Sequence, residues 1–333
     1  MDTLAGLLDG PRARGAFLLR SILEPPWSLR IQDRAPLTLV AVVRGSAWVL
    51  PDGGEPALLE PGDVAVVRDP GHYTVADDPG TPWQVVIHPG QRCTSPNGTP
   101  LDGLSDLGVR TWGTGRAGTT TLLTGTYQVV GEVSDRVLTE LPDLAVVRHE
   151  SLDAPLIDLL AAEIGKNAPG QETVLDRLLD LLLIAALRAW FAGSPDRTPA
   201  WYSAQCDEVV GQALQLIHDA PAEQWTVAGP AARCGLSRAG FARRFTEVVG
   251  EPPMTYLTSW RPALAADLLR ESDATIGAVA RQVGYGSAFA LSNAFKRRFG
   301  TSPQEYRRHD RPESLLAGGA QGAVRQLAGV QAQ

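Results

Sequence analysis

Basic side chains are concentrated at two places near the C-terminus of this 333-residue chain. Arg243 and Arg244 form one pair, and Lys296, Arg297 and Arg298 form a second group. Such groups bind phosphate, and an arginine can also pair with the edge of a guanine through two hydrogen bonds. Taken alone, each group is equally compatible with a charged helix face in solvent. The choice therefore depends on the elements that carry these residues.

The chain around the basic residues is duplicated. Four residue types recur at a constant offset, as the pairs Phe245 and Phe295, Gly250 and Gly300, Pro253 and Pro303, and Tyr256 and Tyr306. Gly235 and Gly284 each follow a short helical stretch and can take the left-handed conformation that ends a helix. Ser237 and Ser287 can cap the helix after each turn. The sequence therefore predicts two helix-turn-helix motifs.

The second helix of each copy has an apolar stripe and an outward face. The stripes have the i, i+4, i+8 spacing, at Phe241, Phe245 and Val249 in the first copy and at Leu291, Phe295 and Phe299 in the second. The outward faces carry Ala239 and Arg243 in one copy and Phe289 and Asn293 in the other. Two outward faces of this kind suit the major grooves of DNA.

The stretch from about Asp207 to Arg308 resembles the DNA-binding domain of AraC/XylS-type transcription regulators. The resemblance is carried by Trp225-Thr226-Val227, Leu236-Ser237-Arg238, Phe241 to Phe245, Gly250 to Pro253, Trp260-Arg261, Val283-Gly284-Tyr285, Ala294 to Gly300 and Ser302-Pro303. It implies a domain over 207–309 with motifs at about 226–248 and 275–299, joined by a connecting helix at about 254–270. Pro262 departs from the family pattern and can kink that helix.

The resemblance also implies roles for single side chains. Base reading falls on Ala239, Ala242 and Arg243 in the first helix and on Ala288, Phe289 and Asn293 in the second. Of these, Arg243 suits guanine and Asn293 suits adenine, while Phe289 either touches a thymine methyl or packs back into the core. Phosphate contacts are expected from Arg238, Arg244, Ser287, Lys296 and Arg297. One subunit would then read two successive major grooves, about 34 Å apart.

Residues 1–150 have the pattern of a β-domain. Short apolar runs such as Leu37 to Val43 and Asp63 to Val67 alternate with turns such as Pro61-Gly62 and Pro70-Gly71. This spacing suggests a small barrel or jelly roll, and its turns resemble the cupin barrel of one branch of these regulators. The predicted fold is therefore multidomain α+β: a cupin-like β-barrel sensor domain, then helices and an all-α DNA-binding domain.

A cupin barrel also raises an enzyme hypothesis, because many cupins bind a metal through paired histidines and a carboxylate. The strand expected to carry the pair, Ser46 to Leu50, offers no ligand, and His72 is isolated. We therefore expect no metal, no cofactor and no catalytic residue. The alternatives for this domain are a pocket for an unknown small-molecule effector or an aromatic core, in either case built on Trp27, Trp48, His72 and Trp83.

Three cysteines are too few for a disulfide framework. Cys93 follows Arg92 in a loop, where a nearby arginine can lower the pKa of a thiol and make it a redox sensor. Three hypotheses therefore stay open: a ligand-responsive transcription regulator, a redox-responsive regulator acting through Cys93, and a cupin enzyme with a DNA-binding appendage.

Helical periodicity begins after the β-domain, over residues 151–192. The segment Glu172 to Phe191 is apolar on more than one face, so it is either a core helix of one subunit or a helix that also packs against a second subunit. The resemblance implies a homodimer through this region. Residues 193–206 form a linker rich in glycine and proline, and 310–333 are predicted to be a disordered tail.

The net charge of −7 is unevenly distributed. Residues 204–309 contain more basic than acidic side chains, so the acidity belongs to the rest of the chain. No run approaches the roughly 18 apolar residues of a membrane span, and the N-terminus lacks the positive start of a signal peptide. We expect a cytoplasmic protein that binds double-stranded DNA, contacts RNA polymerase if it activates transcription, and has no membrane partner.

Overall fold

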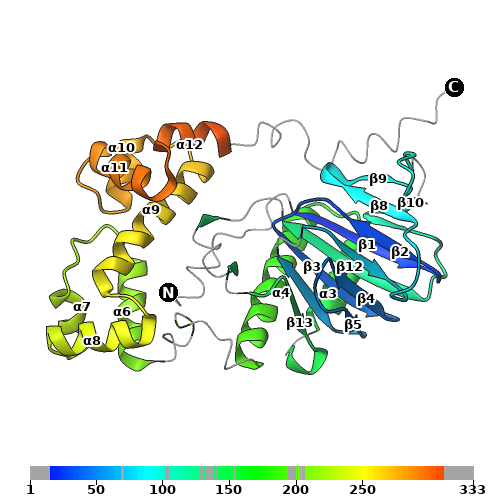
Figure 1. The fold of residues 1–333 in the computed structure, drawn as a ribbon, viewed down its shortest axis with the longest axis horizontal. Helices are drawn as coiled ribbons and strands as arrows, with labels where there is room; N and C mark the ends of the chain where they lie inside the picture. Colours follow the sequence, from blue (N-terminus) through cyan, green and yellow to red (C-terminus); the bar gives the residue numbers. More distant parts are fainter. Residues whose placement is uncertain are drawn as a thin grey trace. The chain divides into compact units, whose positions relative to one another are not determined.

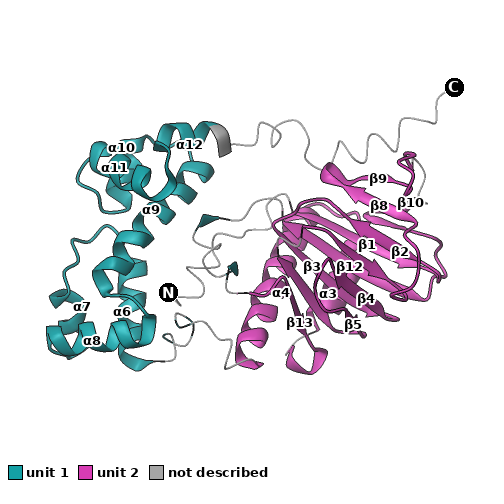
Figure 2. Cartoon of the chain, viewed as in Figure 1, with its two compact units in different colours: residues 1–10, 131–140, 194–313 teal, residues 11–130, 141–193, 314–333 magenta. Residues whose placement is uncertain are grey.

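The computed structural model describes residues 16–310, except for 69–70, 102–105, 128–130, 133–137, 140, 153–154, 194–199, 201, 203 and 205–206. The described residues form two compact units (Figure 2). The sheet unit holds those of 11–130 and 141–193, and the helical unit holds those of 131–140 and 194–313. Residues 311–333, most of the predicted tail, and much of the predicted linker at 193–206 lie outside the described residues.

The described part of the sheet unit contains two sheets (Figure 1). The larger has the strand order β10 (Asp106–Gly108), β11 (Thr111–Gly113), β1 (Phe17–Leu23), β12 (Thr120–Tyr127), β3 (Leu37–Arg44), β6 (Val64–Arg68) and β13 (Leu144–Val147). The smaller has the order β5 (Ala57–Leu59), β4 (Ala47–Pro51), β7 (Tyr73–Ala76), β2 (Ser28–Ile31), β8 (Val85–His88) and β9 (Arg92–Thr94). The expected α+β class is confirmed, although the two sheets do not close into a barrel.

The core of this unit lies between the two sheets, because each sheet turns one apolar face inward. Val40 and Val42 of β3 and Leu122 of β12 face it from the larger sheet, and Val49 of β4 and Val75 of β7 face it from the smaller. The chain turns from β3 in the larger sheet to β4 in the smaller sheet at Gly45, whose φ is 75°. A Cβ at this glycine would lie 2.7 Å from Oγ1 of Thr120, so a side chain is excluded there by space as well as by conformation.

Two helices follow the sheets in the same unit, α3 (Leu156–Ile164) and α4 (Gln171–Gly193), and short 3₁₀ turns lie at Pro89–Gln91 and His149–Ser151. The long helix α4 packs against β12, where the hydroxyl of Tyr127 donates to the Leu179 carbonyl at 3.3 Å. Gly125 leaves room for that helix, because a Cβ there would be only 2.4 Å from a methyl of Leu179. The segment expected to be a helix apolar on several faces therefore covers the larger sheet.

The helical unit contains the two expected motifs (Figure 1). Its helices are α6 (Glu208–Asp219), α7 (Ala228–Arg233), α8 (Arg238–Val249), α9 (Pro253–Glu271), α10 (Ile276–Gln282), α11 (Ala288–Phe299) and α12 (Pro303–Asp310). Helices α7 and α8 form the first motif and α10 and α11 the second, with α9 between them. Pro262 is buried inside α9, which continues through it to Glu271, so the proline does not divide the connecting helix.

The two copies use the same local devices. Gly235 and Gly284 have φ of 69° and 85° at the sharp turns. The hydroxyl of Ser237 accepts a hydrogen bond from the Gly240 amide, and that of Ser287 accepts one from the Ala290 amide, both at 3.1 Å. Each oxygen satisfies one of the amides that a helix leaves unpaired at its start. The duplicated residues therefore recur because each copy needs the same turn and cap.

Candidate nucleic-acid interface

Helix α8 presents a small and basic outward face. Arg238, Ala239 and Arg243 are exposed and Ala242 is half-buried, whereas Phe241 on the opposite face is fully buried. The Arg243 side chain is 79% exposed, and its contact with Glu247 is a loose pair at 3.8 Å. Exposed pairs of this kind contribute little, so the guanidinium remains available to a ligand.

Helix α11 presents an aromatic ring to solvent. Phe289 is 75% exposed, the largest exposure among the large hydrophobic residues that the structure describes. Asn293 lies one turn further along the same face and is also exposed. Leu291 and Phe295 on the opposite face are fully buried. Of the two alternatives for Phe289, the structure removes the one in which it packs back into the core.

Arg244 is engaged within the helical unit. Its Nε and Nη2 lie 3.2 and 2.8 Å from the two carboxylate oxygens of Asp207. Asp207 caps α6 by accepting from the amides of Val209 and Val210. Burial opposes ionisation of this carboxyl, but the hydrogen bonds from Arg244 and from the two amides keep its pKa below the ordinary value. The side chain expected to contact phosphate therefore ties α8 to the start of α6.

The remaining expected phosphate contacts lie at the two ends of α11. Ser287 is exposed at the N-terminus, and Lys296 and Arg297 are exposed in the last turn. Basic residues in a last turn also complement the helix dipole, so this placement has a structural reason as well. Arg298, beside them, has its guanidinium carbon 5.9 Å from the centre of the Phe299 ring.

Arg261 joins α9 to the segment between α6 and α7. Its Nε donates to the Pro221 carbonyl at 3.0 Å, and its Nη2 donates to the Glu223 carbonyl at 2.7 Å. The turn of the second motif closes on the same place, because a Cβ at Gly284 would lie 2.6 Å from that Pro221 oxygen and 2.7 Å from the Arg261 guanidinium. Gly284 is thus required by packing as well as by its φ. The Trp260-Arg261 signature of the sequence acts here as a positioning element.

The sheet unit holds a cavity of about 40 Å³ between its two sheets. Its apolar lining includes Leu19, Ile31, Val40, Ile87, Trp112 and Leu122, and its polar lining includes Ser21, Asp33, Tyr73, Gln91, Thr124 and Thr126. The lining residues come from several distant strands, one or a few from each. No local motif marks them, so they could not be predicted from the sequence.

The four residues expected at an effector pocket lie elsewhere. Trp27 is buried in the core, Trp48 and His72 are half-buried, and Trp83 is 47% exposed. The guanidinium of Arg30 lies 4.6 Å from the centre of the Trp83 ring, and the two Nη atoms of Arg30 bind the carboxylate of Asp52. None of the four residues lines the cavity.

The cavity contains one acidic group. Burial raises the pKa of Asp33, against hydrogen bonds from the Ala35 amide and the Gln91 side chain that lower it. Burial also raises the pKa of Tyr73, and the nearby Asp33 carboxyl adds to this shift. Because a buried carboxylate is costly without a charged partner, this cavity favours a ligand that donates hydrogen bonds or carries positive charge.

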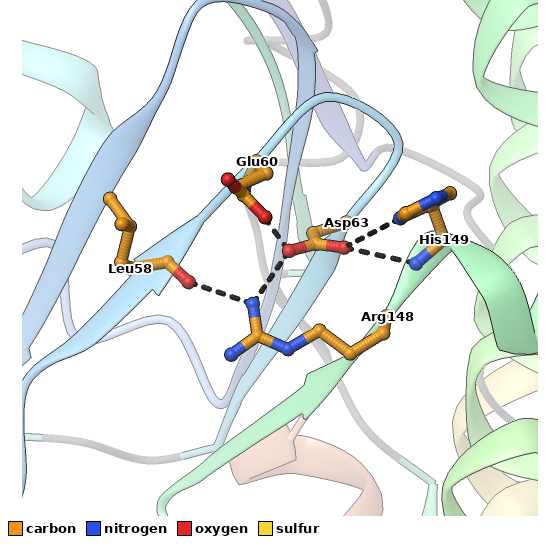
Figure 3. Close-up of polar contacts among 5 residues, drawn as sticks. All are labelled: Leu58, Glu60, Asp63, Arg148 and His149. Atoms are coloured by element: carbon orange, nitrogen blue, oxygen red, sulfur yellow. Dashed lines mark hydrogen bonds and ion pairs between the residues drawn. The ribbon is translucent and has the colours of Figure 1, made fainter.

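A second carboxylate of the sheet unit is used to hold two loops together (Figure 3). Asp63, whose side chain is 1% exposed, accepts from the Glu60 amide at 3.0 Å, the His149 amide at 2.9 Å and the Arg148 guanidinium at 2.7 Å. Arg148 also donates to the Leu58 carbonyl at 2.9 Å. These contacts join the turn between β5 and β6 to the chain after β13. The Pro61-Gly62-Asp63 turn is therefore a structural element.

His149 brings an imidazole close to this carboxylate, with Nδ1 3.7 Å from Asp63 Oδ1. One imidazole and one carboxylate are fewer ligands than a zinc or iron site uses. In the part of the chain that the structure describes, no three or more His, Cys, Asp or Glu side chains gather as a metal-binding group.

The Cys93 thiol does not have the environment that a reactive thiol needs. It is half-buried against the core of the sheet unit, with Sγ 3.6 Å from the Gln91 carbonyl. Burial raises its pKa, so the expectation that Arg92 lowers this pKa is wrong. Cys234 is also half-buried with a raised pKa, and Cys206 lies outside the described residues.

Among the described helices, none has both the length and the apolar character required to cross a membrane.

Known proteins resemble both parts of the chain. The family model described as Cupin matches residues 2–192, and the one described as Helix-turn-helix domain matches residues 231–309. A putative AraC-like transcription regulator of Streptomyces antibioticus is 31% identical over 320 residues, covering 94% of this chain and 100% of that protein. One of Streptomyces lividans is 31% identical over 317 residues, covering 93% of this chain and 99% of its own length.

Two further similar proteins match only part of the chain. The transcriptional regulator AlkR of Acinetobacter baylyi is 36% identical over 178 residues, which are 51% of this chain and 58% of AlkR. The solved DNA-binding domain of AdpA in complex with a target DNA is 34% identical, covering 31% of this chain and 92% of that one, with a TM-score of 0.30.

The relatives matched along their whole length are regulators, so the protein is not a cupin enzyme with a DNA-binding appendage. With a cupin domain at its N-terminus and a helix-turn-helix domain at its C-terminus, the chain belongs to the AraC-like family of DNA-binding transcription regulators.

Proposed function

We propose that this regulator recognises an asymmetric operator by placing α8 and α11 in successive major grooves. The observation that carries the proposal is the pair of outward faces described above, Arg243 on one helix and Phe289 with Asn293 on the other. The two motifs share the same turn glycine and serine cap, but their exposed side chains differ. The two halves of the operator therefore have different sequences.

Each exposed side chain suits a particular base. The Arg243 guanidinium can donate two hydrogen bonds to a guanine, and the Asn293 amide can exchange two with an adenine. Phe289 can contact the methyl group of a thymine, which is an apolar target in the same groove. Ala239, Ala242 and Ala288 are small enough to let the helices approach the base edges closely.

Arg238, Ser287, Lys296 and Arg297 are the proposed phosphate contacts, because they are exposed around the same two faces. Arg244 is assigned a positioning role in place of a phosphate contact, because Asp207 engages its guanidinium.

The experiment is selection of bound fragments from random DNA with the purified full chain, followed by the same selection with Arg243→Ala and Asn293→Ala. We expect two conserved blocks about one helical turn apart. Each variant should lose preference in one block only. A single block, or loss of preference in both blocks with either variant, would contradict reading by two helices.

We further propose that the sheet unit senses a small molecule in the cavity between its sheets. The support is the mixture of apolar walls with a few polar groups, which is the usual lining of a ligand site. A cavity of about 40 Å³ is small, so a ligand of more than a few atoms would have to displace lining side chains. The raised pKa of Asp33 and of the Cys93 thiol favours this cavity over cysteine oxidation as the place of sensing.

The protein is proposed to work as a homodimer in the cytoplasm, where its DNA lies. Leu159 of α3 and Val174 and Leu181 of α4 are 45–50% exposed. Val174 and Leu181 are two helical turns apart and therefore lie on the same face of α4. A second copy of the chain would cover this face through a twofold contact. If the protein activates transcription, RNA polymerase is a further partner, and transcription in vitro distinguishes activation from repression.

A further inference from the structure

Residues 131–140 lie between two strands of the sheet unit in the sequence, but they group with the helical unit in the structure. Residues 131–140 connect β12 to β13, which are both strands of the larger sheet, but they belong to the helical unit with residues 194–313 (Figure 2). Gly131, Glu132, Leu138 and Thr139 are the described residues of this segment. Of these, Gly131 and Leu138 are buried, Leu138 with 1% exposure.

Glu132 makes three polar contacts with the helical unit. Its amide donates to Oδ1 of Asp267 at 2.7 Å. Its carboxylate accepts from the Tyr306 hydroxyl at 2.8 Å and from Nη2 of Arg270 at 3.3 Å. The side chains of Glu132, Arg270 and Asp267 are 24%, 18% and 9% exposed, so these contacts are largely shielded from water. Hydrogen bonds to charged groups in such surroundings are stronger than those in solvent.

The backbone at Gly131 packs closely against the Asp267 side chain of α9. The residue is buried, and a Cβ on it would lie 3.0 to 3.1 Å from the carboxylate of Asp267. That distance is shorter than ordinary contact, and Asp267 is itself held by Arg270, 3.7 Å away on the same helix. A residue with a Cβ at position 131 would therefore require the Asp267 side chain to shift.

Tyr306 connects these contacts to the second reading helix. Its ring packs edge-on against Phe295 at 5.2 Å and lies 5.5 Å from Phe299, both on α11. The guanidinium carbon of Arg270 lies 4.9 Å from the centre of the same ring. Phe295 is the fully buried anchor of the helix that exposes Asn293 on its other side. Glu132 thus holds the hydroxyl of a ring that supports α11 from behind.

We propose that Glu132 is a positioning residue for the second helix-turn-helix, supplied by a segment of the cupin domain. The carboxylate fixes Tyr306 and Arg270, and through them the orientation of α11 in its groove, whereas α8 has its own support in the Arg244 and Asp207 pair. The same strand that leads into the segment, β12, carries cavity-lining residues. The inference rests on the proposed reading of DNA by α8 and α11.

The test compares three variants of the full chain on the selected operator and on two derivatives, each scrambled in one block. Glu132→Ala should bind the intact operator about five- to tenfold more weakly, the equivalent of about one lost hydrogen bond of ordinary net strength. The same loss should be found where only the α11 block is intact. Binding where only the α8 block is intact should change by less than about twofold.

Conservative changes separate positioning from folding. Glu132→Gln keeps an acceptor for Tyr306 and should recover part of the affinity. Tyr306→Phe keeps the ring but removes the hydroxyl. Its loss of affinity should not add to that of Glu132→Ala, because both variants remove the same hydrogen bond between Tyr306 and Glu132. Glu271→Ala is the matched control, since it removes an exposed carboxylate from α9, the helix that carries Asp267 and Arg270. Equal losses on both blocks, or no loss with Glu132→Ala, would overturn the proposal.

A measurement without DNA keeps this inference separate from the proposed function. Amide hydrogen exchange should show lower protection in α12 and in the second half of α11 for Glu132→Ala, with α8 unchanged. If the wild-type chain selects no operator, the proposed function fails, while hydrogen exchange still decides whether Glu132 supports α11. Unchanged protection in α11 and α12 would sink the positioning role regardless of any DNA result.

Discussion

Arg244 and Asp207 form a two-bond ion pair that fastens the first reading helix to the beginning of α6. The adjacent Arg243 has a similar exposed position but only a loose partner. Neighbouring arginines on one helix therefore have different roles: Arg244 holds the helix in place and Arg243 is available to DNA.

Replacing each arginine separately should show this division. Arg244→Ala should lower the thermal unfolding temperature and leave the preferred base sequence unchanged, because it removes a support and no base contact. Arg243→Ala should leave the unfolding temperature unchanged and cost about 1–3 kcal/mol of DNA affinity at one base position. Calorimetry and binding to operators mutated at single positions measure the two effects. A loss of affinity with Arg243→Ala that is equal on all sequences would identify a phosphate contact.

Phe289→Ala should weaken DNA binding without weakening the fold. The ring is 75% exposed, so its removal leaves no cavity in the protein. The matched change on the buried side of the same helix, Phe295→Ala, should lower the free energy of unfolding by about 3–5 kcal/mol. Urea unfolding and DNA titration of both variants check the contrast. A Phe289→Ala variant as destabilised as Phe295→Ala would contradict the exposed position of the Phe289 ring.

Asp63 should make the sheet unit sensitive to acid. Its carboxyl is desolvated, but hydrogen bonds from the Glu60 amide, Arg148 and the His149 amide outweigh burial and lower the pKa from its ordinary 3.8. A depressed folded pKa contributes stability that is present above about pH 4 and is lost as the pH falls through the lower folded value.

Asp63→Asn should therefore cost about 2–3 kcal/mol at neutral pH, since it removes hydrogen bonds to a charged group. The difference from wild type should shrink as the pH falls from about 4 through the lower folded pKa, where the wild-type carboxyl becomes protonated as well. Urea unfolding at a series of pH values measures it, and a difference independent of pH would contradict the pairing.

The pKa of Asp33 is shifted in the opposite direction from that of Asp63. Burial raises its folded pKa, so the ionised carboxyl destabilises the folded state above that pKa. Asp33→Asn keeps an oxygen for the Ala35 amide and should raise the unfolding temperature at neutral pH, with no difference below about pH 4. The variant should also lose any stabilisation that a small apolar amine gives to the wild type. Thermal shift assays measure both, and a lower unfolding temperature for the variant would refute the assignment.

Leu181→Lys should convert the proposed dimer to a monomer, because it places a charge on the exposed apolar face of α4 that carries Val174 and Leu181. Light scattering during gel filtration measures the mass. Thr119→Lys, at an exposed position next to β12, is the control and should leave the mass unchanged. A wild-type chain that is monomeric at high concentration would show that this face has no second copy on it.

The duplicated DNA-binding region was largely predictable because its determinants are local. A glycine at positive φ, a serine cap and an i, i+4, i+8 apolar stripe each act within one or two helical turns. The α+β class followed in the same way from alternating runs and turn dipeptides. Pro262 shows where this reasoning is weak, since a local rule allows a break in the helix, whereas α9 continues through the buried proline to Glu271.

The sequence by itself determined which faces of α8 and α11 point outward, because the period of a helix assigns each residue to one side. The packing of distant elements shows that Asp207 holds Arg244, that Asp33 lines the cavity whereas Trp27, Trp48 and Trp83 do not, and that the Tyr306 hydroxyl donates to Glu132. Those relationships join residues far apart in the chain. Which distant groups meet depends on how the elements pack, and spacing along the sequence does not contain that information.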